Sequence, residues 1–258
     1  MVEHVPRAGA SSCPVHPRDD ALAAFIASMP VAYAEAFDRE AIAAHAAIVA
    51  RRSGAVHVES WQELDDGVVA ICITADDRPG LLAQISSALV LNAIDVVRAE
   101  AYCRRAEHGA IEAVDLLWVR AIVIDVAAPA PRVDVARLEA ILGAIVSGLG
   151  SMRSPPAPSR GISPPAAGSG ATVRFVKSRR SGAIELFVEA VDRPGLLLAI
   201  TRALYRAGVQ IVALRARSEA GSATDRFEIA EADGAPLSSR RLLAVQAAIL
   251  EAMDHGAA

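Results

Sequence analysis

The chain has 258 residues, of which 53% are apolar, and its 26 basic and 30 acidic side chains give a net charge of −4. This length leaves room for two domains of roughly 100 residues each, and the apolar content excludes a disordered chain. A charge so close to neutral gives no support for a nucleic-acid-binding protein, and nucleic acid is not an expected partner.

Three cysteines at no metal-like spacing argue against a disulfide framework, which fits a reducing compartment. The start of the chain lacks the apolar stretch of a secretory signal, and no window of about 18 apolar residues predicts a membrane span. We therefore expect a cytoplasmic protein with no membrane partner.

From residue 20 onward the pattern of the N-terminal region is helical. An aspartate precedes Ala21–Ser28, and Asp38 precedes Arg39–Arg52, so each is predicted to cap a helix. His45 lies beside the apolar stripe of the second helix, and we interpret it as a packed or half-exposed side chain without a functional role.

The remaining chain repeats one order of elements. The first unit is predicted to contain strand Val56–Ser60, strand Val68–Ala75, helix Leu81–Asn92, strand Ile94–Cys103, a turn over Arg104–Gly109, strand Ile111–Ile124 and helix Val135–Leu149. The second is predicted to contain strand Val173–Lys177, strand Ala183–Ala190, helix Leu196–Ala207, strand Val209–Ser218, a turn over Glu219–Ser222, a strand end at Phe227–Ala230 and helix Ser239–Met253. Strands and helices in this order predict an α+β protein made of two ferredoxin-like units, each with its helices on one face of an antiparallel sheet.

A ferredoxin-like βαββαβ unit needs a fourth strand after its second helix, and too few residues follow Met253 to form one. The leading strands Val56–Ser60 and Val173–Lys177 are candidates for the two vacant places. We therefore predict that Val173–Lys177 pairs within a sheet.

The most specific feature is a motif that occurs twice, as Asp77-Arg78-Pro79-Gly80-Leu81-Leu82 and as Asp192-Arg193-Pro194-Gly195-Leu196-Leu197, at a spacing of 192 − 77 = 115 residues. Each copy leaves an apolar strand and enters a helix. The free amides at a helix start attract a carboxylate, and a nearby aspartate attracts an ammonium group, which together match a free α-amino acid. The same motif is also explained as a stiff turn in which the aspartate bonds loop amides, and the residues alone leave both interpretations open.

These loops, together with Gly208-Val209-Gln210-Ile211 at the start of a strand, resemble the ACT domain, a small module that binds amino acids in metabolic enzymes. The order of the flanking segments is similar to the tandem ACT region of the bacterial PII uridylyltransferase/uridylyl-removing enzymes, which sense glutamine in nitrogen metabolism. The resemblance spans about residues 20–255 and implies an amino-acid-sensing regulatory protein, with glutamine as the first candidate ligand.

The resemblance implies ligand-binding residues in both loops and at the start of the strand that follows each loop's helix. They are Asp77, Arg78, Pro79, Gly80, Leu81 and Asp95 in the first unit, and Asp192, Arg193, Pro194, Gly195, Leu196 and Gln210 in the second. The first unit has Ala93 where the second has the expected Gly208, which puts its turn in doubt. Asp95 also adds an acid, which Arg78 or Arg98 would have to neutralise. On this interpretation the loop at Asp192, combined with Gln210, is the better site.

No nucleotidyltransferase motif, His-Asp metal motif or nucleophilic triad occurs in the sequence, so we expect no enzyme, no metal and no cofactor. The alternatives are an interaction or oligomerisation module that binds no ligand, and a fragment of a uridylyltransferase. A regulated protein is an expected partner, and exposed sheet edges would allow a homodimer. The expected boundaries are a disordered tail at 1–19, a helical lead-in at 20–54, the first ACT domain at 55–150, a Pro/Gly/Ser linker at 151–171 and the second ACT domain at 172–258.

Overall fold

The computed structural model describes residues 17–106, 109–123, 131–149, 170–178 and 182–255. The helices are α1 Pro17–Ser28, α2 Val31–Ala34, α3 Arg39–Arg51, α4 Leu81–Leu91, α5 Val135–Val146, α6 Leu196–Arg206 and α7 Ser239–His255, with a 3₁₀ turn η1 at Asp65–Gly67. The strands are β1 Val56–Glu63, β2 Val69–Asp76, β3 Ile94–Arg105, β4 Ile111–Ala121, β5 Thr172–Lys177, β6 Ile184–Val191, β7 Val209–Glu219 and β8 Ser222–Glu231. Most of the predicted tail and nearly all of the predicted linker lie outside the described residues.

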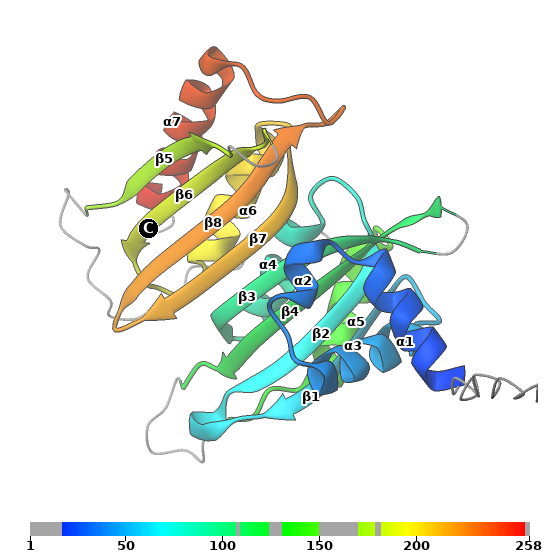
Figure 1. Ribbon diagram of the computed structural model, residues 1–258. Coiled ribbons are helices and arrows are strands. Elements are labelled where there is room, and N and C mark those ends of the chain that lie inside the picture. The colour runs from blue at the N-terminus through cyan, green and yellow to red at the C-terminus, as the bar shows by residue number, and fades with distance from the viewer. Residues whose placement is uncertain (1–16, 107–108, 124–130, 150–169, 179–181, 256–258) are drawn as a thin grey trace, which may run out of the picture.

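All strands belong to one antiparallel sheet with the order β1-β2-β4-β3-β7-β8-β6-β5. Each unit contributes four neighbouring strands, and the units join where β3 pairs with β7, from Arg98 opposite Arg217 to Ala101 opposite Leu214. Figure 1 shows the two halves of this sheet side by side. The prediction of an α+β protein with two ferredoxin-like units is confirmed.

The fourth place in each half of the sheet is filled by the strand that precedes the repeat. β1 pairs with β2, and β5 pairs with β6 from Thr172 to Lys177, so the predicted pairing of Val173–Lys177 is confirmed. The two strands form the outer edges of the sheet, and a helix side chain binds the backbone of each. Glu139 of α5 accepts a hydrogen bond from the Val58 amide at 2.8 Å, and Gln246 of α7 donates one to the Val173 carbonyl at 2.7 Å.

Some predicted boundaries were wrong. Arg104 and Arg105, assigned to a turn, continue β3, where Arg104 bonds Glu112 of β4 at 2.7 Å across the strand pair. β8 begins at Ser222, well before the predicted strand end, and α5 ends at Val146 instead of Leu149.

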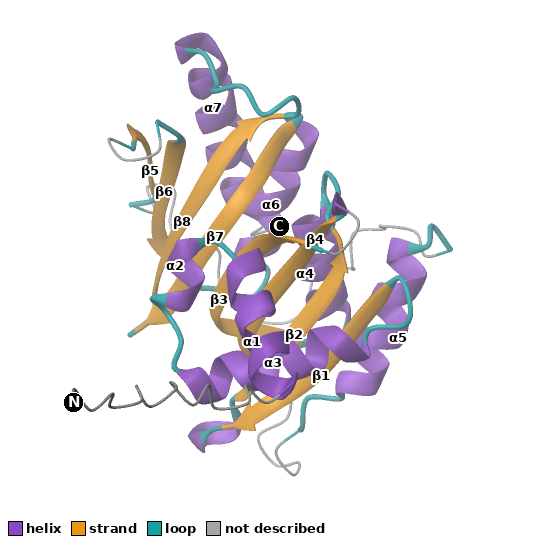
Figure 2. Ribbon diagram, turned by 45° about the vertical axis from the view of Figure 1, so that its right-hand side comes forward, coloured by secondary structure: helices purple, strands orange, loops and turns teal. Residues whose placement is uncertain are grey.

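The two faces of the sheet are covered differently. Helices α4 to α7 lie behind the strands in Figure 1, where the buried side chains of both units form one continuous apolar core. The opposite face of the first unit is covered by α1 to α3 and has its own core. Figure 2 shows α1 and α3 in front of β1 and β2. In the described residues no helix has both the length and the apolar content to cross a membrane.

Asp38 caps α3 by accepting from the Ala41 amide at 2.8 Å, as predicted. His45 is fully buried in the core under α1 to α3, and its Nδ1 lies 2.8 Å from the Tyr33 hydroxyl. The interpretation of His45 as a packed side chain is therefore confirmed.

Candidate functional site

The two repeated loops have the same backbone geometry. Gly80 precedes α4 with φ 82° and ψ 5°, and Gly195 precedes α6 with φ 82° and ψ 3°, both in the left-handed region that favours glycine. The loop aspartates are held alike, since the Asp77 amide donates to the Ile111 carbonyl at 3.0 Å and the Asp192 amide to the Gly221 carbonyl at 2.9 Å. The duplicated sequence therefore folds into duplicated turns.

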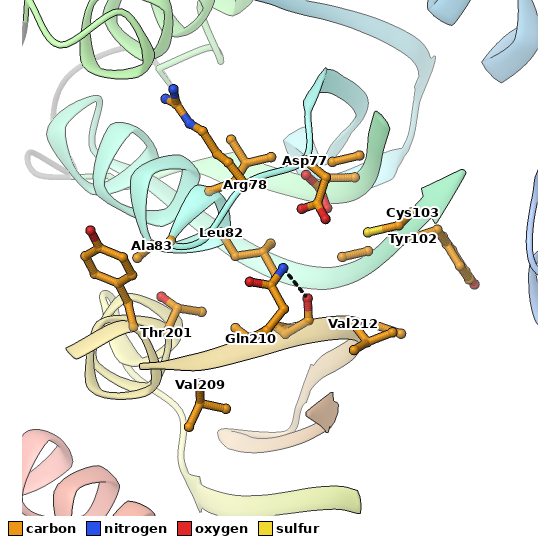
Figure 3. Close-up of a pocket in the computed structure, with 18 residues that line it drawn as sticks. Asp77, Arg78, Leu82, Ala83, Tyr102, Cys103, Thr201, Val209, Gln210 and Val212 are labelled. Atoms are coloured by element: carbon orange, nitrogen blue, oxygen red, sulfur yellow. Dashed lines mark hydrogen bonds between the residues drawn. The ribbon is translucent and has the colours of Figure 1, made fainter. Parts of the chain in front are cut away.

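The loop arginines bind protein atoms at the ends of the last helices. Arg78 donates to the Val146 carbonyl at the end of α5 and to the Gln84 side chain, each at 2.7 Å. Arg193 donates to the Met253 carbonyl in the last turn of α7. Figure 3 shows the Arg78 side chain turned away from the space that Asp77 faces. Both arginines thus join the loop to the last helix of its own unit, α5 or α7.

Two pockets lie along the seam between the units. The first seam pocket is lined by Asp77, Arg78, Gly80, Leu81, Leu82, Ala83, Ala101, Tyr102, Cys103, Ala113, Asp115, Thr201, Tyr205, Val209, Gln210, Ile211, Val212 and Ala213. The second seam pocket is lined by Ser86, Leu89, Val90, Ile94, Asp95, Val96, Val97, Asp192, Arg193, Gly195, Leu196, Leu197, Leu198, Ala216, Arg217, Ser218, Ala223 and Asp225. Each pocket combines the loop of one unit with a strand start of the other, and neither Pro79 nor Pro194 is among the lining residues.

The combination of loop and strand predicted from the sequence was wrong. Asp77 and Gln210 line one pocket, and Asp192 and Asp95 line the other. Within a unit, β2 and β3 run in the same direction, so the loop after β2 lies a full strand length from Asp95 at the start of β3. β7 runs antiparallel to β3 and begins beside its end, which brings Gln210 to the loop of the first unit. Figure 3 shows Gln210 on β7 facing the Asp77 loop.

The prediction that Arg78 or Arg98 neutralises Asp95 was also wrong. Arg120 of the neighbouring strand β4 bonds the Asp95 carboxylate at 2.9 Å, whereas Arg98 bonds Glu100 and lies over the Trp118 ring at 4.3 Å. Asp95, which lines the second seam pocket, is therefore already paired with an arginine.

The doubt about Ala93 is resolved by its backbone. Ala93 has φ 52° and its amide bonds the Val90 carbonyl at 3.0 Å, and Gly208 has φ 69° and bonds the Tyr205 carbonyl at 2.9 Å. The two turns are therefore equivalent, although alanine occupies a strained conformation in one of them.

Sequence reasoning missed a second aspartate in each pocket. Asp115 lies opposite Ile73 in the strand pairing and Asp225 opposite Val188, which are equivalent positions of the two units. Both are buried, at 3% and 4% exposure. An aspartate at the equivalent strand position of both copies was the signal that could have found them.

Burial controls the ionisation of these acids. Burial, together with the nearby charge of Asp77, raises the pKa of Asp115 to about 8, and burial together with the charge of Asp192 raises the pKa of Asp225 to about 7. Burial also raises the pKa of Asp77, which a hydrogen bond from the Cys103 thiol partly offsets. In Figure 3 the Asp77 carboxylate and the Cys103 thiol face the same space.

The pockets are narrow. Their cavity volumes are about 30 and about 40 Å³. Since one water needs about 10–15 Å³ on this measure, each has room for a few waters. An amino acid would enter only if the seam widened. Among the described residues, no group of His, Cys, Asp and Glu side chains is arranged to hold a metal ion.

Comparison with known proteins supports the resemblance noted above. The chain is 27% identical over 235 residues to the bifunctional uridylyltransferase/uridylyl-removing enzyme of Phenylobacterium zucineum (strain HLK1), covering 90% of this chain and 24% of that enzyme. The predicted resemblance is confirmed. The chain spans about a quarter of the length of this relative, and no protein-family model matches it.

Two solved structures share a weaker similarity. An unknown protein from Galdieria sulphuraria is 18% identical and covers 73% of this chain and 91% of its own, with a TM-score of 0.24. Aspartate kinase from Synechocystis is 14% identical and covers 81% of this chain and 44% of its own, with a TM-score of 0.20. Scores this low carry no argument, so the fold assignment depends on the strand order and the duplicated units.

Proposed function

We propose that this chain is a regulatory module that senses a free amino acid in the two seam pockets. The observation that carries the proposal is that each pocket takes its loop from one unit and its strand start from the other. A ligand in either pocket would contact both units at once. The helix starts of α4 and α6 supply amides for a carboxylate, and the loop aspartates supply an acceptor for an ammonium group.

The narrowness of the pockets provides the regulatory step. Because neither cavity holds an amino acid as it stands, binding has to widen the seam and so changes the packing of α4 against α6 or of β3 against β7. Such a change couples the ligand to whatever surface a regulated protein reads. Glutamine is the first candidate ligand, since the matched relative is a uridylyltransferase of the kind that the sequence resembles.

A thermal-shift screen over the common amino acids tests the proposal. A ligand present at 100 times its Kd should stabilise the protein by about 2.7 kcal/mol. Asp77→Ala and Asp192→Ala each remove the acid of one loop, so a response lost in one variant identifies the occupied pocket. A flat response across the panel would reject the sensing function.

The same narrowness favours a second candidate function, an interaction module whose seam only holds the two units together. This candidate predicts no amino-acid response and normal binding of a protein partner by the Asp77→Ala and Asp192→Ala variants. The absence of catalytic activity remains a prediction, which an assay for UTP-dependent labelling of a PII-type protein would test.

A further inference from the structure

Each seam pocket contains a pair of carboxyl groups at the same place. The first pairs Asp77 of the loop with Asp115 of β4, and the second pairs Asp192 with Asp225 of β8. In both, the strand acid lies on the sheet face that α4 to α7 cover and is almost completely excluded from solvent. Burying an acid is costly, so finding the same pair twice is not explained by the turn that the loop aspartate alone could make.

The hydrogen bonding of Asp115 is incomplete. Its Oδ2 is buried and has no hydrogen-bond partner among the described residues, although the side chain lines the first seam pocket. A buried polar atom without a partner costs free energy that a bound group can recover. The pocket therefore presents an unsatisfied carboxyl oxygen to whatever enters it.

We propose that the ligand's ammonium group binds between the two carboxyl groups of each pair, which makes Asp115 and Asp225 specificity-determining residues for amines. This inference rests on the proposed amino-acid sensing for the rest of the ligand, because the helix start would take the carboxylate. The N–H groups of one ammonium group can donate to oxygens of both carboxyl groups, whereas binding by the loop aspartate alone leaves the buried Oδ2 of Asp115 without a partner among the described residues.

Proton release accompanies this binding. In the free pocket Asp115, with a pKa of about 8, is mostly protonated at pH 7, and Asp225, with a pKa of about 7, is about half protonated. An ammonium group beside either acid favours the charged carboxylate. The protonated acid and the ligand's ammonium group therefore give a carboxylate, a bound ammonium group and one proton that leaves to solvent. The charge is conserved and no other reactant is needed.

The remaining ionisable groups near each pair do not replace the ammonium group. Asp115 is faced by Asp77 and by the Cys103 thiol, whereas Cys72 lies on the opposite face of the sheet. The first pocket also contains Arg78, which binds the Val146 carbonyl and the Gln84 side chain. The second pocket also contains Arg193, which binds the α7 carbonyl, Arg217 on β7, and Asp95, which is paired with Arg120. The first pocket is therefore the simpler one in which to measure the effect.

Calorimetry at pH 7 in two buffers of different ionisation enthalpy counts the released protons. The probes are L-glutamine, or the amino acid with the largest thermal shift in the screen, 4-carbamoylbutanoate, which lacks the amino group of glutamine, and 4-aminobutanamide, which lacks its carboxylate. We expect glutamine to release up to one proton for each filled pocket and 4-carbamoylbutanoate to bind at least about 10-fold more weakly. 4-Aminobutanamide should bind more weakly than glutamine, but its binding should still release protons.

Asp115→Asn and Asp225→Asn imitate the protonated acids and retain their shape. Each should weaken amino-acid binding in its own pocket by about 10- to 100-fold and abolish the proton released there. Asp20→Asn, an exposed change of the same type in α1, is the matched control and should alter neither quantity. If a pocket variant fails to fold, the number of protons that the unaltered protein releases on binding tests the proposal by itself.

The outcomes separate this inference from the proposed function. One outcome is that the amino acid binds without releasing protons and with the same affinity in the unaltered protein and the asparagine variants. That result would reject ammonium binding between the carboxyl groups and leave the sensing function intact. No amino-acid response together with proton-releasing binding of 4-aminobutanamide rejects the sensing function and supports the pairs. No binding of any probe rejects both.

Discussion

Gly80 lies directly against the ring of Tyr205. A Cβ atom added at Gly80 would lie 2.6 Å from Cδ2 and 2.7 Å from Cε2 of Tyr205, so the start of α4 and the end of α6 touch at the first seam pocket. The equivalent Gly195 has the same φ of 82° but its nearest neighbour, Cγ2 of Val90, lies 3.9 Å away. The two loops therefore share one backbone conformation and differ in how closely the other unit approaches.

This difference provides a matched pair of substitutions. Gly195→Ala should cost about 1–2 kcal/mol of unfolding free energy, from placing alanine in the left-handed region alone. Gly80→Ala adds a clash with the Tyr205 ring, worth about 1–3 kcal/mol more. Urea denaturation of both variants measures the difference.

Removing the ring isolates the clash. In a Tyr205→Ala background, Gly80→Ala should cost no more than Gly195→Ala, since only the backbone strain remains. Equal costs for the two glycine substitutions in the unaltered protein would show that Tyr205 simply moves aside.

The strained turn at Ala93 yields a second prediction. Ala93→Gly should stabilise the protein by about 0.5–1 kcal/mol because glycine adopts positive φ without the steric cost that alanine has. The matched change Gly208→Ala, at φ 69°, should destabilise it by a similar amount. Thermal unfolding of both variants checks the signs, and destabilisation by Ala93→Gly would mean that the alanine side chain packs more strongly than its strain costs.

The buried acids predict an unusual dependence of stability on pH. The folded protein retains the protons of Asp115 and Asp225, with pKa values of about 8 and about 7, after the unfolded chain has released them near pH 4. Because the folded state then binds more protons than the unfolded state, the stability contribution of these groups falls as pH rises from about 4 to about 8. The ceiling for Asp115 is about 5 kcal/mol over this interval.

Asparagine variants test this dependence without any ligand. Asp115→Asn and Asp225→Asn should each flatten the decline in unfolding free energy between pH 5 and 8 and should make the protein more stable at pH 8. Asp20→Asn should leave the pH profile unchanged. A decline that persists in the double variant would have to come from other groups.

The duplicated sequence made the fold predictable. Two identical loops, each between an apolar strand and an apolar-periodic helix, indicated two copies of one unit, and the missing final strand pointed to Val173–Lys177 as its replacement. These inferences depend on local periodicity and on the number of strands that a ferredoxin-like sheet requires. Both are properties of a single unit.

Which residues line each pocket depends on how the two units pair, and no local sequence pattern contains that information. Asp77 and Asp95 belong to one unit, but β2 and β3 are parallel and separate them by a strand length. Only the β3–β7 pairing between units brings Gln210 to Asp77. Asp115 was missed for a related reason, since an acid within a strand acquires meaning only when the helix start and the other unit enclose it.

The buried pair of His45 and Tyr33 predicts that the region under α1 to α3 is sensitive to acid. Burial lowers the pKa of His45 to about 4, so the unfolded chain binds a proton near pH 6.5 that the folded state does not accept. The contribution of His45 to stability is therefore fully present above about pH 6.5 and is lost as pH falls toward 4, with a loss of about 2 kcal/mol by pH 5. This direction is opposite to that of Asp115 and Asp225.

Tryptophan fluorescence distinguishes the two effects, because both tryptophans of the chain, Trp61 and Trp118, pack against this region. The His45 and Trp61 ring centroids lie 4.5 Å apart, so opening of α1 to α3 should change the emission between pH 7 and 5. A Tyr33→Phe/His45→Leu variant removes both hydrogen-bonding partners together and should be insensitive to pH in this interval. An acid transition of the same size in that variant would assign the sensitivity to another group.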